Sequence, residues 1–229
     1  MAQSFFERTR GGLIVSCQAL PEEPLHSSYI MSRMAYAAMC GGACGIRANS
    51  VEDIREIRKT VDLPMIGIIK RVIPGCDAYI TPSIQEVDAL VGTGVEVIAM
   101  DATGGSRPSG RTLAEDFAQI RAKYPDQLFM ADCATLEEGV LAQELGFDMV
   151  GTTLRGYTPS TKGVTPPDFG MIRELCASIR IPVIAEGGIW RPDQLREALS
   201  IPGVHAAVVG SAITRPMEIT RRFAAALAR

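Results

Sequence analysis

Eight short apolar segments recur along the chain, and this repetition constrains the fold more than any other feature of the sequence. The segments are continuous rather than alternating, which is typical of strands buried on both faces of a parallel sheet. Amphipathic stretches of helical length lie between them, so the pattern is a strand followed by a helix, repeated eight times. The segments are LIVSCQA (13–19), ACGIRA (43–48), PMIGIIK (64–70), VEVIAMDA (95–102), LFMADCA (128–134), MVGTTL (149–154), PVIAEGGI (182–189) and AAVVGSAI (206–213).

Four of the helical stretches begin with a capping box, in which a hydroxyl side chain is followed three residues later by an acid. Each box comes just after an apolar segment, so the helix starts are marked independently of the strands. The pairs are Ser50/Asp53, Ser83/Glu86, Thr112/Glu115 and Thr135/Glu138.

Eight regularly alternating strands and helices predict an α/β fold of the closed (β/α)8 type, the TIM barrel. The chain has 229 residues, close to the ~250 residues of such a barrel. The main alternative is an open sheet that binds a dinucleotide, which needs a Gly-x-Gly-x-x-Gly turn after the first strand. The sequence there is SCQALPEEP. No linker divides the chain, so we expect residues 1–229 to form a single (β/α)8 barrel domain with a short N-terminal helix.

Charge and composition narrow the range of partners. The net charge of −3 and the pI near 5.5 argue against nucleic acid as a partner, whereas an anionic small molecule needs only a few local cations. The N-terminus has no apolar signal sequence, and the longest near-apolar run, 34–46, is too short to span a membrane. The six cysteines form no Cys-x-x-Cys pair and only two histidines are present, so we expect no metal site and a cytoplasmic location.

Polar side chains stand at the carboxyl ends of the predicted strands, which is where such barrels carry their active sites. Buried charges are rare unless they are paired or functional. So many polar strand ends therefore predict one shared polar cavity. These residues are Gln18, Arg47, Lys70, Asp101, Asp132, Thr152 or Thr153, Glu186 and Ser211.

Most of these residues also allow a structural interpretation. Lys70 is followed by Arg71 and can be the first solvated residue of a loop. Asp132 can cap a helix, and Asp101 fits loop structure as well as it fits a site. Glu186 is the hardest to explain structurally, because it follows an apolar run and directly precedes two glycines.

Glycines follow the seventh and eighth predicted strands, and these two loops often bind phosphate in this fold. Gly187–Gly188 and Gly210–Ser211 leave backbone N–H groups open to an anion, and Arg215 adds a cation nearby. The structural alternative is that these glycines serve only tight strand-to-helix turns. Residues 155–170 form the longest polar loop, which we interpret as either a mobile lid or a passive connection.

Seven of these motifs, in this order, resemble those of the N-acetylmannosamine-6-phosphate 2-epimerase family. They are SCQA, GIRA, IIK, MDAT, ADC, GTTL–GYT and AEGGI, and the resemblance covers essentially the whole chain. Arg155 departs from it, because a small residue is expected at this position in many members.

The resemblance implies the inversion of C2 that interconverts N-acetylmannosamine 6-phosphate and N-acetylglucosamine 6-phosphate, in the breakdown of sialic acid. It implies that Lys70 and Glu186 are the catalytic pair and that no metal or organic cofactor is needed. The expected partner is a phosphorylated N-acetyl hexosamine, and a homodimer is ordinary for the fold. The implied substrate-binding residues are Gln18, Arg47, Asp132 and Thr153, with Gly187, Gly188, Gly210, Ser211 and Arg215 at the phosphate.

The chemistry of C2 inversion agrees with these residue types. In the open-chain aldehyde the C2 proton is acidic enough to be removed, and inversion requires that a proton return on the opposite face. Lys70 and Glu186, four strands apart, are expected on opposite walls, with Lys70 or Arg47 stabilising the enolate oxygen. Opposite charges on Asp132 and Glu186 are expected to raise the pKa of Lys70, which would favour its role as an acid.

Three other functions compete with this one. A phosphosugar-acid aldolase would use Lys70 to form a Schiff base. A ribulose-phosphate 3-epimerase would need metal-binding histidines, which have no counterparts here. A non-catalytic phosphosugar sensor would bind without turnover, although it would not need a full acid–base pair.

Overall fold

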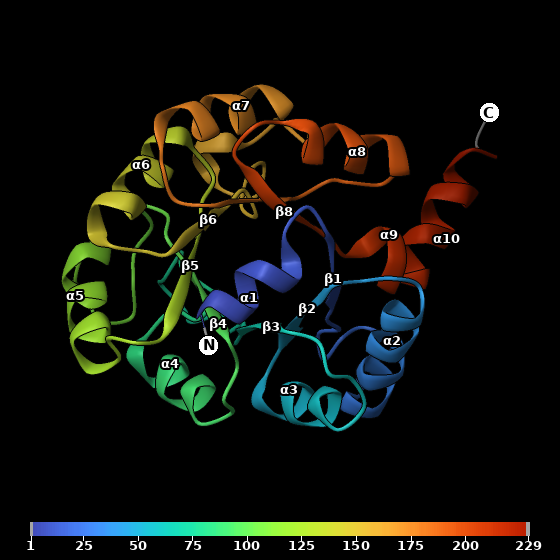
Figure 1. Ribbon diagram of the computed structural model, residues 1–229, viewed down its shortest axis with the longest axis horizontal. Coiled ribbons are helices and arrows are strands. Elements are labelled where there is room, and N and C mark those ends of the chain that lie inside the picture. The colour runs from blue at the N-terminus through green and yellow to red at the C-terminus, as the bar shows by residue number, and fades with distance from the viewer. Residues whose placement is uncertain (1, 228–229) are drawn as a thin grey trace.

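The chain folds into a closed barrel of eight parallel strands, each paired with its neighbours in sequence and β8 with β1 (Figure 1). The computed structural model describes the backbone of residues 2–227 and the side chains of residues 5–227. The predicted (β/α)8 fold is therefore confirmed, while the single-domain boundary 1–229 stays a prediction whose ends lie outside the described residues. The strands are β1 (Leu13–Cys17), β2 (Gly45–Asn49), β3 (Met65–Ile68), β4 (Val97–Asp101), β5 (Leu128–Asp132), β6 (Met149–Gly151), β7 (Val183–Glu186) and β8 (Val204–Val209).

Helices follow the strands and surround the barrel. All four predicted hydroxyl caps bond to the first turn of their helices, but only Thr112 and Thr135 form complete, reciprocal capping boxes. Within residues 2–227, none of the helices combines the length and the apolar character that crossing a membrane requires. The helices are α1 (Ala2–Thr9), α2 (Ser28–Cys40), α3 (Val51–Arg58), α4 (Ile84–Val91), α5 (Leu113–Lys123), α6 (Leu136–Leu145), η1 (Pro159–Thr161), α7 (Phe169–Ser178), α8 (Pro192–Ser200), α9 (Ser211–Thr214) and α10 (Pro216–Ala225).

Apolar side chains fill the barrel and close it at the amino ends of the strands. Ile66, Val97 and Ile184 come from three different strands and belong to one buried cluster with Phe5 of α1. The hydroxyl of Thr9 lies 3.0 Å from Nε2 of His205, near the start of β8. Helix α1 covers this end (Figure 1), which leaves the carboxyl ends of the strands as the side open to a ligand.

Two long loops build the open end. After β3 the chain folds back on itself, so that Lys70 pairs with Ile80 in an isolated antiparallel bridge. The loop after β6 contains η1 and is held by Arg155, whose guanidinium Nη2 lies 2.8 Å from Oδ2 of Asp168 and whose Nη1 donates to the carbonyl of Ala134 at 3.2 Å. Arg155 thus ties the beginning of the segment 155–170 to Asp168, the N-cap of α7, near the end of the same segment.

Candidate active site

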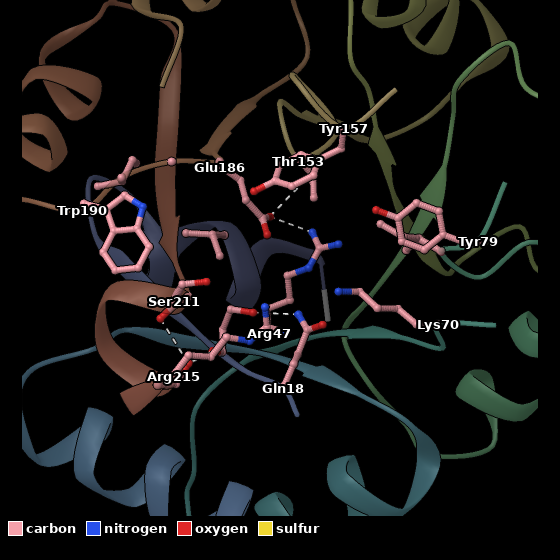
Figure 2. A pocket seen from close by; sticks show the side chains of 18 residues that line it. Gln18, Arg47, Lys70, Tyr79, Thr153, Tyr157, Glu186, Trp190, Ser211 and Arg215 are labelled. Atoms are coloured by element: carbon pink, nitrogen blue, oxygen red, sulfur yellow. Dashed lines mark hydrogen bonds and ion pairs between the residues drawn. The ribbon is translucent and has the colours of Figure 1, made fainter. Parts of the chain in front are cut away.

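One cavity at the carboxyl ends of the strands collects most of the predicted site residues (Figure 2), but neither Asp132 nor Asp101 lines it. Lys70 enters it from the side of β3, and Glu186 from the opposite side, at the end of β7. The cavity-lining residues that the sequence predicted are Gln18, Arg47, Lys70, Thr153, Glu186, Gly187, Gly188, Gly210, Ser211 and Arg215.

A buried cluster of charges forms the floor of this cavity. Arg47 is 1% exposed, and its guanidinium donates to Oδ1 of Asp132 at 3.0 Å, to Oδ2 of Asp132 at 2.5 Å and to Oε2 of Glu186 at 2.8 Å. Asp132 is fully buried beneath the cavity. A single guanidinium therefore holds two carboxylates. Burial lowers the pKa of Arg47, but the charges of Asp132 and Glu186 together more than offset this, so its pKa is raised and it stays charged.

Two adjacent threonines of the β6 loop fix the position of Glu186. The hydroxyl of Thr152 donates to the backbone carbonyl of Glu186 at 2.8 Å and accepts from its N–H at 3.0 Å. The hydroxyl of Thr153 lies 3.1 Å from Oε2 of Glu186 and 2.6 Å from Oδ1 of Asp132. Thr152 thus holds the backbone, while Thr153 contacts the carboxylates.

The burial of Glu186 favours its protonated form. Desolvation raises the pKa of its carboxyl group above the ordinary value, and the positive charge of Arg47 only partly opposes this effect. Within residues 5–227, Oε1 of Glu186 accepts no hydrogen bond. This oxygen is the one available for proton transfer to a bound molecule.

The pKa of Lys70 is lowered to about 8, first by burial and then by the positive charges of Arg47 and Arg215. The prediction that the pKa of Lys70 is raised is therefore wrong, and the geometry of the charge cluster gives the reason. Asp132 and Glu186 are already paired with Arg47, so their attraction for Lys70 is smaller than the cost of burying its charge. A lysine with this pKa can take up or release a proton near neutral pH.

The glycines after β7 have the conformational role that the sequence offered as the structural alternative, and one of them also has a packing role. Gly187 and Gly188 have φ angles of 106° and 67°, values that favour glycine. A Cβ atom on Gly188 would lie 2.2 Å from the carbonyl oxygen of Pro166, so the loop after β6 packs directly on this position. The side chain is absent at Gly188 because of this loop contact.

Backbone N–H groups nevertheless point to an anion site in the loops after β7 and β8. Within the described part of the chain, the amides of Gly187, Gly188 and Ser211 have no hydrogen-bond acceptor, and all three residues line the cavity. Arg215 lines the same end, where its guanidinium lies 3.1 Å from Oε2 of Glu23. Donors and a cation thus meet at the wall where the sequence predicts a phosphate.

Three aromatic residues of the cavity were not predicted. Tyr79, Tyr157 and Trp190 all line it, and the guanidinium of Arg222 in α10 lies 3.5 Å from the ring centre of Trp190. Trp190 directly follows the predicted AEGGI motif, which is the one signal that would have found it. Tyr79 lies in a loop far from any predicted strand end, so only the fold-back after β3 brings it to the site.

The protein is a closed (β/α)8 barrel with a lysine and a glutamate on opposite walls of a cavity at the carboxyl ends of its strands. This combination is typical of (β/α)8-barrel enzymes that use general acid–base catalysis. The comparisons with known proteins specify the family. Residues 31–229 match the family model described as "Putative N-acetylmannosamine-6-phosphate epimerase", and the chain belongs to this family.

Relatives of high identity extend over the full length. A protein of Pediococcus pentosaceus, described as "Putative N-acetylmannosamine-6-phosphate 2-epimerase", is 52% identical over 229 residues, which is 99% of this chain and 100% of the relative. One of Enterobacter sp. (strain 638) with the same description is 54% identical and covers 95% of this chain and 93% of its own length. The family resemblance of the sequence is thereby confirmed.

Solved structures agree with this assignment. The N-acetylmannosamine-6-phosphate 2-epimerase from Clostridium perfringens is 51% identical, with a TM-score of 0.91 over 96% of this chain and 95% of that one. A thiamine phosphate pyrophosphorylase from Pyrococcus furiosus, at 19% identity and a TM-score of 0.63, shares the fold alone.

Proposed function

We propose that this chain interconverts N-acetylmannosamine 6-phosphate and N-acetylglucosamine 6-phosphate by inverting C2. The observation that carries the proposal is the placement of Lys70 and Glu186 on opposite sides of one cavity (Figure 2) in a member of this epimerase family. Inversion at a carbon next to a carbonyl requires one proton acceptor and one proton donor on opposite faces of that carbon. These two side chains supply that pair.

The two pKa shifts suit the exchange of a single proton. Glu186 has a raised pKa and Lys70 has a pKa lowered to about 8, so the values approach each other from both sides. In one direction the carboxylate removes the C2 proton and the ammonium group returns one to the other face; in the reverse direction the neutral amine removes it and the carboxylic acid returns one. The pair therefore carries one exchangeable proton in both directions, on Lys70 in the first case and on Glu186 in the second.

The rest of the cavity is suited to the sugar and its phosphate. We assign the phosphate to the free amides of Gly187, Gly188 and Ser211 and to Arg215, because helix starts and exposed N–H groups bind anions. Gln18 is assigned to the sugar, since its buried Oε1 has no hydrogen-bond partner within residues 5–227. A hydroxyl or amide N–H of the substrate would satisfy this acceptor.

The pH dependence of kcat/KM is expected to be bell-shaped. The rate falls on the alkaline side as Lys70 loses its proton near pH 8, about two units below the ~10.4 of an unperturbed lysine. Because the pair must hold one exchangeable proton in either direction and loses it at high pH, the alkaline limb should coincide for the two epimers. Initial rates from pH 5 to 10.5 test this, and a rate that stays constant up to pH 10 would contradict it.

Proton NMR of the purified protein with N-acetylmannosamine 6-phosphate tests the proposal directly. New signals of the gluco epimer are expected, and the same equilibrium mixture should form from either epimer. If no epimer forms, calorimetric binding would indicate a sensor, and a borohydride-trapped adduct on Lys70 with a keto-acid phosphate would indicate an aldolase.

We further propose that the chain forms a homodimer, because apolar surface remains uncovered in the single chain, whereas its cytoplasmic location stays a prediction. Helix α10 has no fully buried residue and points away from the barrel (Figure 1); its Phe223 is 76% exposed, and Leu227 just beyond it is 83% exposed. An open hollow along α8 is lined in part by Leu195 and Leu199. Pairing of two copies over such surfaces would remove them from water. Sedimentation equilibrium should give twice the chain mass, and a monomer at micromolar concentration would refute the dimer.

A further inference from the structure

Tyr79 and Lys70 are held together by the same piece of backbone. The chain after β3 folds back so that Lys70 pairs with Ile80. On either side of this bridge, the N–H of Thr81 donates to the carbonyl of Ile69 at 2.7 Å, and the N–H of Arg71 donates to the carbonyl of Tyr79 at 2.9 Å. The backbone of Tyr79 is therefore held beside that of Lys70.

Asp101 fastens this ribbon to the end of β4. Its backbone N–H donates to the carbonyl of Ile80 at 2.7 Å, and its Oδ2 accepts from the N–H of Tyr79 at 3.2 Å. The other carboxylate oxygen accepts from the N–H and the hydroxyl of Thr103, at 3.1 and 2.7 Å. Asp101 is 1% exposed and does not line the cavity. This answers what the sequence left open: Asp101 supports the loop that carries Tyr79.

The phenol of Tyr79 is a free donor inside the cavity. Figure 2 shows its ring beyond Lys70, with the hydroxyl directed toward the interior. Within residues 5–227 this hydroxyl has no hydrogen-bond partner. Burial and the charge of Asp101 raise the pKa of Tyr79 to about 12, so the hydroxyl keeps its proton at neutral pH.

Arg47, which forms part of the cavity floor, is less suited than Tyr79 to bind a new negative charge. Both of its terminal nitrogens already donate to carboxylates of Asp132 and Glu186. The proposed phosphate wall, with Ser211 and Arg215, lies at the other side of the cavity from Tyr79, and Lys70 and Glu186 reach between them (Figure 2). A substrate whose phosphate is bound at that wall and whose C2 lies between the pair therefore extends its C1 toward Tyr79.

We propose that Tyr79 donates a hydrogen bond to the C1 oxygen of the substrate, where negative charge develops as the C2 proton leaves, and that Asp101 is the positioning residue for this contact. The inference rests on the proposed epimerase activity and adds an oxyanion donor to it. Because the charge on the oxygen is larger in the enolate-like transition state than in the bound aldehyde, the contact acts on kcat rather than on substrate binding.

Tyr79→Phe tests the contact, since it removes only the hydroxyl. Loss of an oxyanion donor lowers kcat by ~10²–10³-fold, and we expect a decrease of about 10²-fold with little change in KM. Tyr36→Phe is the matched control, because Tyr36 lies on α2, is 47% exposed and is remote from the cavity lining. The control variant should keep the wild-type kcat. Near-normal kcat in Tyr79→Phe, or a change in KM alone, would overturn the proposal.

A double-mutant cycle tests the role of Asp101. Asp101→Asn replaces one carboxylate oxygen by an NH2 group. The amide side chain then has a single acceptor oxygen and can no longer accept from both Tyr79 and Thr103 as the carboxylate does. If Asp101 acts through Tyr79, the double variant should be no slower than the slower single variant. Additive losses in kcat would show that Asp101 acts elsewhere. An inactive wild-type protein, by contrast, would contradict the proposed function and not this inference alone; urea unfolding of every variant checks that it is folded.

Discussion

Replacing Lys70 by methionine is expected to stop epimerisation, with a loss of at least ~10²–10⁴-fold in kcat. The variant keeps a long apolar side chain but has no group that exchanges protons on its wall of the cavity. Glu186→Gln should have an effect of similar size, because the amide cannot accept the C2 proton. Coupled or NMR rate measurements in both directions give the values.

Exchange of the C2 proton with solvent distinguishes the roles of Lys70 and Glu186 more clearly than the rate of epimerisation does. In D2O, Glu186→Gln keeps Lys70 and should still exchange the C2 proton of the one epimer whose proton faces Lys70. Lys70→Met keeps Glu186 and should exchange the C2 proton of the other epimer. Equal exchange of both epimers by a single variant, or near-normal turnover by either, would contradict the assignment of these residues to opposite faces.

Arg47→Met is expected to lower the free energy of unfolding by ~3–5 kcal/mol, because it leaves buried carboxylates without their cation. In the native chain this guanidinium holds Asp132 and Glu186 at 2.5–3.0 Å. Arg173→Met is the matched control. Its partner Glu197 lies 2.9 Å away and both side chains are about half exposed, so a loss of about 0–1 kcal/mol is expected there.

The same variant should show a definite pH dependence. Arg47 is the strongest influence that lowers the pKa of Glu186, whose net shift is already upward. Removal of the Arg47 guanidinium raises the pKa of Glu186 further. In the folded variant Glu186 therefore binds its proton more tightly than it does in the unfolded chain. Such a group stabilises the folded state below its unfolded pKa of ~4.3 and loses this contribution as the pH rises through the folded value. The loss measured by urea unfolding should therefore be larger at pH 8 than at pH 5; the opposite order would contradict the ion cluster.

The fold could be predicted because parallel, doubly buried strands are continuous apolar runs. The errors lie at the strand ends. The third predicted strand runs to Lys70, whereas β3 ends at Ile68 and Lys70 lies in a separate bridge. The hydroxyl caps marked the helix starts correctly, but Asp53 and Glu86 do not accept from the backbone N–H of their cap residues. Asp53 accepts from the Ser28 hydroxyl, and Glu86 accepts from Arg71 and from the Ser83 hydroxyl.

The site was less accessible to sequence reasoning, because its properties depend on contacts between distant segments. The sign of the Lys70 shift requires knowing that Arg47 already pairs with both carboxylates. The need for glycine at 188 comes from Pro166, more than twenty residues away in the sequence. Tyr79 reaches the cavity only because its loop folds back beside β3. The sequence was sufficient to predict which residues at the strand ends form the site. It was not sufficient to predict their protonation or the loop residues that contact them.

Proton NMR with N-acetylmannosamine 6-phosphate in D2O tests the central claim most directly. The account predicts N-acetylglucosamine 6-phosphate that carries deuterium at C2, because the proton removed by one wall is replaced from the other by a group equilibrated with solvent. A gluco epimer that keeps its original C2 proton would contradict deprotonation and reprotonation by Lys70 and Glu186.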